Sequence, residues 1–258
     1  MIDSHCHLDF KQLRGRLDDI IDEAVSVGVH TIVNIGVDLP ASIRSINLAE
    51  RYDMIYASVG VHPHDASTLD RETLIKLKDM AAHDKVVAIG EIGLDYYRDL
   101  SPRKVQKQAF RKQLELAVEL KMPVVIHTRE AFRDTVEIVN DYVSDLVGGV
   151  FHCFPGSAED AEEVFAMGFI ISVGGVITYN NSRMSQMASH VPLDKIILET
   201  DAPFLTPVPL RGKTNQPAYV KHTCKKLAEL QGVSETEVEK ITDRTCQKLY
   251  RLVETFGD

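Results

Sequence analysis

Short runs of β-branched and other apolar residues alternate with amphipathic stretches along nearly the whole chain. Between the apolar runs, hydrophobic residues recur at the three- and four-residue spacing of a helix, as at positions 17, 20, 21, 24 and 25 of Leu17–Val27. Such a stretch predicts a helix with one buried face. The runs that predict strands are Ile2–His5, Thr31–Gly36, Ile55–Val61, Val86–Glu91, Pro123–His127, Gly149–His152, Phe169–Val173 and Lys195–Glu199.

Residues that start or stop helices support this pattern. Gly28 follows the first predicted helix, Pro123 follows the longest one, and Ser234 with Glu237 resembles a capping box. The other predicted helices are Pro40–Tyr52, Ser101–Leu120, Ser157–Met167, Lys221–Gln231 and Ser234–Val253.

Regular alternation of strands and helices predicts βαβ units and therefore a parallel sheet. Eight strands in 258 residues match the size of a (β/α)8 barrel. We therefore expect one α/β TIM-barrel domain over residues 1–258, with an additional C-terminal helix. A doubly wound open sheet is the alternative. It is disfavoured because no GxGxxG motif follows an early strand, and because the polar residues at strand ends are spread along the whole chain.

Composition limits the classes of protein to which the chain can belong. Hydrophobic residues make up 44% and charged residues 26%, as in an ordinary soluble globular protein. No apolar stretch approaches the length of a membrane span, no basic-then-apolar leader is present, and the four cysteines form no CxxC pair. We expect a cytoplasmic monomer with reduced thiols and no membrane partner. The net charge of −9 argues against a general basic surface that coats nucleic acid.

Two histidines at the end of the first strand begin a set of candidate metal ligands. One residue separates His5 from His7, so in a strand both point to the same side while Cys6 points away. Neutral imidazole is a common metal ligand, but two exposed histidines can also stand at a strand end by chance. The pair is therefore evidence for a metal site only if other strands bring ligands to the same place.

Other predicted strands end in residues of the same kind. In a barrel the carboxyl ends of all strands open onto one face, where the active site lies. Five of the ten histidines stand at or just beyond strand ends, together with two carboxylates. The further residues are His62, Glu91, His127, His152 and Asp201, whereas His30, His64, His83, His190 and His222 are interpreted as solvated.

Each of these strand ends lies within a longer motif. The motifs are Asp3–Asp9 (DSHCHLD), Gly60–Pro63 (GVHP), Gly90–Tyr96 (GEIGLDY), Pro123–Arg129 (PVVIHTR), His152–Phe154 (HCF), Glu199–Pro203 (ETDAP), and Arg211–Lys213 with Asn215. Together they resemble the TatD family of metal-dependent deoxyribonucleases, within the amidohydrolase superfamily. The resemblance runs in the right order from residue 1 to about residue 250. Where many barrel amidohydrolases carry a carbamylated lysine, this chain has Glu91, which is the TatD pattern.

The resemblance implies a site for two divalent metal ions. The ligands implied for one ion are His5, His7, Glu91 and Asp201, and those for the other are Glu91, His127 and His152. Glu91 is the implied bridge, a hydroxide between the ions is the implied nucleophile, and Asp201 is the implied base that orients it. The ligand types accept Zn or Mn, and the resemblance adds Mg, so the identity of the ions stays open.

A phosphate substrate also needs hydrogen-bond donors near the metal site. Arg129 lies two residues beyond His127 and can reach the same opening, and a guanidinium binds a phosphate through two parallel hydrogen bonds. A structural ion pair at the barrel rim is the alternative role for Arg129. His62 and Arg211 are further candidates for substrate binding, and Lys213 is a weaker one.

Several neighbouring residues have two interpretations. Tyr96 and Tyr97 can stack on a base at the mouth of the site or pack beneath a loop. Asp3 and Glu199 are predicted to point into the barrel one layer below the ligands. There a carboxylate either accepts a hydrogen bond from a ligating histidine or forms a structural pair. Asp95 is a similar case.

We expect a metal-dependent hydrolase that acts on DNA, as a 3′–5′ exonuclease that prefers single strands or ends. The net charge of −9 favours a chain end that enters a pocket made locally positive by two dications. Two alternatives stay open: an enzyme of the same superfamily acting on a small ester, amide or phosphotriester, and a metal-binding interaction protein without turnover. Arg129 and Arg211 favour a phosphate substrate.

Overall fold

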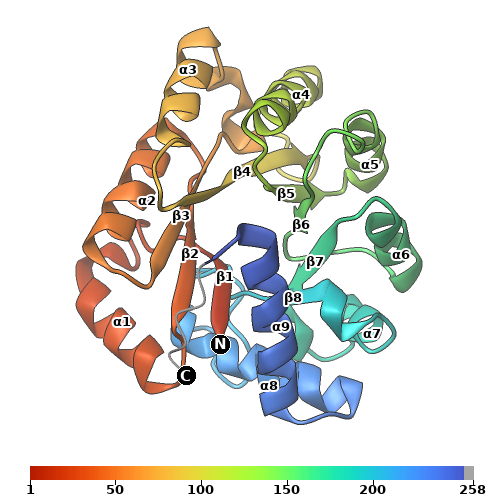
Figure 1. Cartoon of the computed structure of the whole chain (residues 1–258). Helices are drawn as coiled ribbons and strands as arrows, with labels where there is room; N and C mark the ends of the chain where they lie inside the picture. The colour runs from red at the N-terminus through yellow and green to blue at the C-terminus, as the bar shows by residue number, and fades with distance from the viewer. Residues whose placement is uncertain (253–258) are drawn as a thin grey trace.

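The computed structural model describes residues 1–252, in which eight parallel strands curl into a barrel with helices outside it (Figure 1). The strands pair in sequence order, and Cys6 bridges to Ala202 just after the last strand, which brings the first and last strands together. The predicted (β/α)8 barrel is therefore confirmed. The strands are β1 (Ile2–Cys6), β2 (Thr31–Ile35), β3 (Ile55–Val59), β4 (Val86–Asp95), β5 (Val124–Arg129), β6 (Gly149–Phe151), β7 (Ile170–Val173) and β8 (Ile196–Leu198).

The helices surround this barrel, and some of them begin at a residue whose side chain caps the helix. Asp38 accepts from the Ala41 amide at the start of α2, and Ser157 with Asp160 forms a full capping box on α6. At the capping box that the sequence predicts on α9, the Ser234 side chain accepts from the Glu237 amide. The helices are α1 (Leu17–Ser26), α2 (Leu39–Arg51), α3 (Arg71–Met80), α4 (Arg103–Leu120), α5 (Phe132–Asn140), α6 (Ala158–Ala166), α7 (Arg183–Ala188), α8 (Val220–Gln231) and α9 (Glu235–Tyr250).

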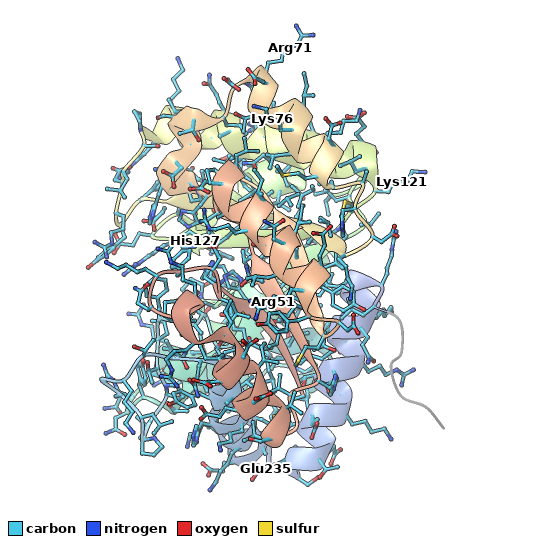
Figure 2. All side chains as sticks on the ribbon, turned by 90° about the vertical axis from the view of Figure 1, so that its left-hand side faces the viewer. Arg51, Arg71, Lys76, Lys121, His127 and Glu235 are labelled. Atoms are coloured by element: carbon cyan, nitrogen blue, oxygen red, sulfur yellow. The ribbon has the colours of Figure 1, made fainter. Side chains whose placement is uncertain are left out.

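Three of these helices, α3, α5 and α7, come in addition to those predicted from the sequence. The predicted end of the last helix at Val253 lies outside the described residues, and α9 itself ends at Tyr250. Arg71 and Lys121 project into solvent from the ends of α3 and α4 (Figure 2). Within residues 1–252, none of the helices combines the length and the apolar character that a membrane crossing requires.

Helix α9 closes the amino-terminal end of the barrel. In Figure 1 it crosses the barrel beside β1 and β8, and its Cys246 and Tyr250 pack against apolar residues at the beginnings of the strands, such as Val87 and Val125. The Ile2 amide donates to the Asp243 side chain of this helix at 2.8 Å. Because this end is filled, the carboxyl ends of the strands are the place where polar side chains can meet a substrate.

Strand β4 differs most from its prediction. The sequence predicts that it ends at Glu91, but it continues to Asp95, and its register against β5 shifts between Ile89 and Ile92. Gly93 has a φ of +140°, and a Cβ atom there would lie 2.0 Å from the carbonyl oxygen of His127. Only glycine therefore allows β4 to pass this close to the β5 backbone and carry both Glu91 and Asp95 to the same side as His127.

Replacing Gly93 by alanine should destabilise the fold by at least about 3 kcal/mol, because it adds a backbone clash to an unfavourable φ. Gly28 is the matched control, since it has a φ of +86° but nothing within 4 Å of the point where a Cβ atom would lie. Gly28→Ala should cost only about 1–2 kcal/mol. Urea unfolding of both variants measures the difference, and equal losses would contradict the role given to Gly93.

Candidate metal centre

Glu91 lies at the centre of the histidine cluster, and its two carboxylate oxygens face different histidines. Oε1 lies 2.8 Å from His127 Nδ1 and 2.9 Å from His152 Nε2. Oε2 lies 3.5 Å from His5 Nε2 and 3.9 Å from His7 Nε2. One buried carboxylate therefore joins two groups of imidazoles that come from opposite sides of the barrel.

Asp201 completes the group that contains His5 and His7. Its Oδ1 lies 3.5 Å from His7 Nε2 and 3.7 Å from His5 Nε2. The Asp201 amide donates to the His5 carbonyl at 2.9 Å, which fixes the chain after β8 against β1. The Asp201 side chain is 14% exposed, compared with 4% for Glu91, so water reaches Asp201 more easily.

His62 lies inside the cluster as well. The sequence predicts it as a substrate-binding residue, and the structure places its Nε2 3.4 Å from Glu91 Oε1. His62, Glu91 and His127 form a group whose donor atoms all lie within 4.8 Å of one another. Burial lowers the pKa of His62 to about 4, so its imidazole is neutral near pH 7. Its Nδ1 accepts from the His64 amide at 3.1 Å, so the ring proton lies on Nε2, where His62 is a hydrogen-bond donor beside Glu91 Oε1.

The second ring nitrogen of several histidines has a neighbour that orients the ring. His7 Nδ1 lies 3.2 Å from a backbone carbonyl of β2, and His127 Nε2 lies 3.1 Å from Asp95 Oδ2. His152 Nδ1 faces Glu199 Oε1 at 3.6 Å. Neighbours of this kind fix the tautomer, so that the other nitrogen can present its electron pair to the cluster.

Asp95 has the first of the two roles that the sequence left open for it, because its carboxylate accepts from His127, a candidate ligand. It is 1% exposed, and the same oxygen that faces His127 lies 2.8 Å from His64 Nε2. Burial opposes its ionisation, but hydrogen bonds from His127, the Arg98 amide and His64 hold its pKa well below the usual value. The interpretation of His64 as solvated is wrong, because β4 extends past Glu91 and brings Asp95 to it.

Asp3 and Glu199 have different roles. Asp3 accepts hydrogen bonds from the amide and hydroxyl of Thr200 at 2.9 and 2.7 Å, so it ties β1 to the chain after β8 as a structural pair. Glu199 accepts a hydrogen bond from Ser172 and turns its other oxygen toward His152. It is therefore placed to support the ring of His152.

The electrostatics of the cluster fit a bound cation. Within residues 1–252, Nε2 of His5, which faces Glu91 and Asp201, is buried without a hydrogen bond, which is unfavourable unless another group binds there. Burial opposes ionisation of Glu91, but the charges of His152 and His62 and a hydrogen bond from His127 hold its pKa well below the usual value. Donor atoms bound to one zinc ion at about 2.0–2.2 Å lie roughly 3–3.5 Å apart, close to the spacing seen here. Burial opposes protonation of His7, His127 and His152, but the neighbouring carboxylates raise their pKa values, and a divalent cation bound there would take the place of those protons.

Two arginines stand at the mouth of the barrel, each over a tyrosine ring. The Arg129 guanidinium carbon lies 3.9 Å from the ring centre of Tyr97, and that of Arg211 lies 4.2 Å from Tyr179. Three other arginines over aromatic rings also form ion pairs: Arg51 with Asp18, Arg103 with Asp99, and Arg133 with Glu163. No carboxylate of residues 1–252 forms an ion pair with Arg129 or Arg211, so the structural ion pair weighed for Arg129 is absent from the described chain.

The two tyrosines after β4 are used differently. The Tyr96 hydroxyl donates to Asp134 at 2.5 Å, and its ring lies under the guanidinium of Arg103. Tyr97 is 55% exposed. Tyr96 therefore packs against residues of α4 and α5 and not on a base, whereas Tyr97 stands at the mouth of the site.

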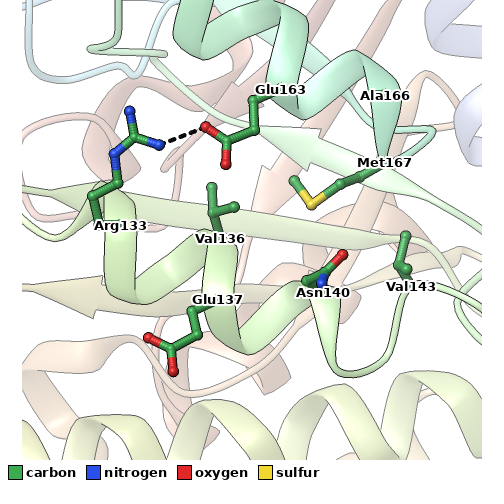
Figure 3. A pocket seen from close by; sticks show the side chains of 8 residues that line it. All are labelled: Arg133, Val136, Glu137, Asn140, Val143, Glu163, Ala166 and Met167. Atoms are coloured by element: carbon green, nitrogen blue, oxygen red, sulfur yellow. Dashed lines mark hydrogen bonds and ion pairs between the residues drawn. The ribbon is translucent and has the colours of Figure 1, made fainter.

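A groove on the outer surface lies apart from this cluster. It runs between α5 and α6, with an apolar floor that includes Val136 and Met167 and an ion pair of 2.6 Å between Arg133 and Glu163 at one end (Figure 3). None of the predicted site residues lines it. The candidate site is instead the polar cluster at the carboxyl ends of the strands.

Comparison with known proteins gives the family. The family model "TatD related DNase" matches residues 2–251. The chain is 42% identical over 253 residues to the "Uncharacterized metal-dependent hydrolase YabD" of Bacillus subtilis (strain 168), covering 98% of this chain and 99% of that one. It is 33% identical over 256 residues to the "3'-5' ssDNA/RNA exonuclease TatD" of Cronobacter sakazakii, covering 97% of each.

A solved structure agrees with these matches. The structure of YjjV, a TatD homologue from Escherichia coli K12, superimposes with a TM-score of 0.92 at 30% sequence identity and covers 98% of both chains. Family model, relatives and fold agree over the same span that carries the histidine and carboxylate cluster. The chain therefore belongs to the TatD-related DNase family and is a metal-dependent hydrolase.

Proposed function

We propose that this hydrolase cleaves phosphodiester bonds of DNA with two divalent metal ions, as a 3′–5′ exonuclease that prefers single strands or ends. The observation that carries the proposal is the division of the imidazoles by Glu91, whose Oε1 faces His127 and His152 while Oε2 faces His5 and His7. A relative named "3'-5' ssDNA/RNA exonuclease TatD" supports the substrate and polarity.

The residues divide into two sets of metal ligands. One ion would be held by His5, His7, Glu91 and Asp201, and the other by Glu91, His127 and His152. When bound, two divalent ions, in this case Mg, Mn or Zn, supply positive charge for a phosphate and make water more acidic. Glu91 stays in place as the shared carboxylate, and its negative charge reduces the repulsion between two cations.

Asp201 is the residue placed to handle the proton of the attacking water. It is the more exposed of the two central carboxylates, and it opens toward the mouth of the barrel. Its amide donates to the His5 carbonyl in β1 and its carbonyl accepts from the Phe204 amide, so the carboxylate has a defined direction. We propose that Asp201 orients the attacking water and accepts a proton from it.

The arginines favour a phosphate over an amide or a carboxylic ester. A guanidinium without a carboxylate partner keeps its hydrogen-bond donors for an anion, and the tyrosine under it holds its plane in a defined position. Arg129 follows His127 by two residues in β5 and therefore stands on the cluster side of that strand. We propose that Arg129 binds the scissile phosphate and that Arg211 is a second hydrogen-bond donor to it. His62, which lies beside Glu91, is proposed to contact the same phosphate.

Asp201→Asn tests the assigned proton acceptor. The variant should fold, because the side chain is partly exposed, but it should lose about 10²- to 10⁴-fold of its rate because an amide cannot accept the proton. Release of nucleotides from the 3′ end of 5′-labelled single-stranded DNA and RNA measures the loss, with circular dichroism as the control for folding.

Three results would contradict the proposal. Wild-type rates in Asp201→Asn would remove this residue from the reaction. A wild-type, metal-loaded protein that leaves oligonucleotides intact while it hydrolyses simple esters, amides or phosphotriesters would favour the small-substrate alternative instead. No turnover of either class would favour a metal-binding interaction protein.

Arg129→Ala tests the phosphate contact. We expect kcat/KM for single-stranded DNA to fall about 10- to 100-fold, which corresponds to the loss of one charge-assisted pair of hydrogen bonds. Arg133→Ala is the matched control, because Arg133 also lies over an aromatic ring but pairs with Glu163 on the outer surface. Equal effects of the two substitutions would show that Arg129 has no specific contact with the substrate.

A further inference from the structure

Two phenylalanines form an aromatic corner beside the candidate metal ligands. The Phe10 ring stacks on His7, with ring centres 4.7 Å apart and an interplanar angle of 25°. Phe204 meets Phe10 edge-on at 5.9 Å, and its centre lies 6.4 Å from that of His7. The corner exists because β1 and β8 close the barrel, which brings the loop after β1 against the loop after β8.

Phe204 is exposed although its loop is firmly held. Its side chain is 45% exposed. Its amide donates to the Asp201 carbonyl at 2.8 Å, and its own carbonyl accepts from the side chain of Asn215 at 2.6 Å. Asn215 is itself fully buried. A single exposed apolar residue needs no explanation, but here a fixed backbone holds an exposed ring next to a candidate ligand of the metal.

The free face of this ring distinguishes it from the tyrosines at the mouth. Tyr97 and Tyr179 each carry a guanidinium over the ring, which occupies a face that a base could use. Within residues 1–252, no cation lies over Phe204. A flat, uncharged group can therefore stack on the face of Phe204, while Arg129 and Arg211 can bind phosphates.

We propose that Phe204, supported by Phe10, is the platform on which the terminal nucleobase of a single strand stacks while its phosphate lies at the metal cluster. The proposal rests on the proposed function and adds a recognition element to it. Because every base has a π face, such a platform accepts all four bases and selects an unpaired end, since a base within a duplex has both faces covered. Because the loop is already fixed, little conformational entropy is lost when the base binds.

Fluorescence of 2-aminopurine tests the stacking directly. The probe is a single-stranded DNA of about ten nucleotides with 2-aminopurine at its 3′ end and a phosphorothioate at the last linkage to slow hydrolysis. Stacking should quench the probe on the wild-type protein, and Phe204→Ala should remove the quenching and weaken binding about 10- to 100-fold. Phe204→Tyr should keep both, and 2-aminopurine at an internal position should respond to none of the substitutions.

Val208→Ala is the matched control, because Val208 lies on the same loop and is 44% exposed, against 45% for Phe204. A second arm uses a strand whose 3′-terminal nucleotide is abasic. On this strand the wild type and Phe204→Ala should be cleaved within about twofold of each other, since there is no base to stack.

The outcomes separate this proposal from the proposed function. If oligonucleotides are cleaved but Phe204→Ala quenches the probe as the wild type does, the platform is wrong and the nuclease stands. If Phe204→Ala and Val208→Ala lose equal activity, the loop has only a structural role and the platform is again wrong. If the wild type neither binds nor cleaves single strands, both proposals are overturned.

Discussion

The carboxylate of Glu91 is the interaction on which the site depends. It is almost fully buried, and burial alone would keep it protonated. The surrounding imidazoles make ionisation favourable, and the two oxygens then face two separate groups of nitrogen donors. A single residue in the middle of a strand thus faces all four histidines of the two candidate ligand sets, and a carboxylate is suited to this because it offers two equivalent oxygens and one negative charge.

The barrel makes this arrangement possible through close contacts near β4. Glu91 lies where the register of β4 against β5 shifts, and the strand then continues to Asp95, which holds both His64 and His127. Gly93 lets the two strands approach at the level of the cluster. Helix α9 fills the amino-terminal end of the barrel. The apolar packing of α9 and the polar candidate site therefore lie at opposite ends of the barrel.

The sequence predicts the barrel and the six candidate ligands that the structure clusters, because strand alternation and strand ends depend on local pattern. It leaves two roles open for Asp95 and misses the contact of Asp95 with His64, since a strand that continues through an irregular register looks in sequence like a strand followed by a loop. It also misses Phe10 and Phe204. Those rings meet only because the first and last strands close the barrel, a contact between residues 194 positions apart that no local pattern encodes.

An acidic protein can still bind a polyanion if its positive charge is gathered at one place. Here Arg129 and Arg211 stand at the end of the barrel that holds a cluster suited to divalent metals. The most direct test of this account is the anomalous scattering of manganese in crystals of the protein grown with Mn²⁺. The account predicts two peaks beside Glu91, one among His5, His7 and Asp201 and the other among His127 and His152. A single peak elsewhere, or none at Glu91, would contradict it.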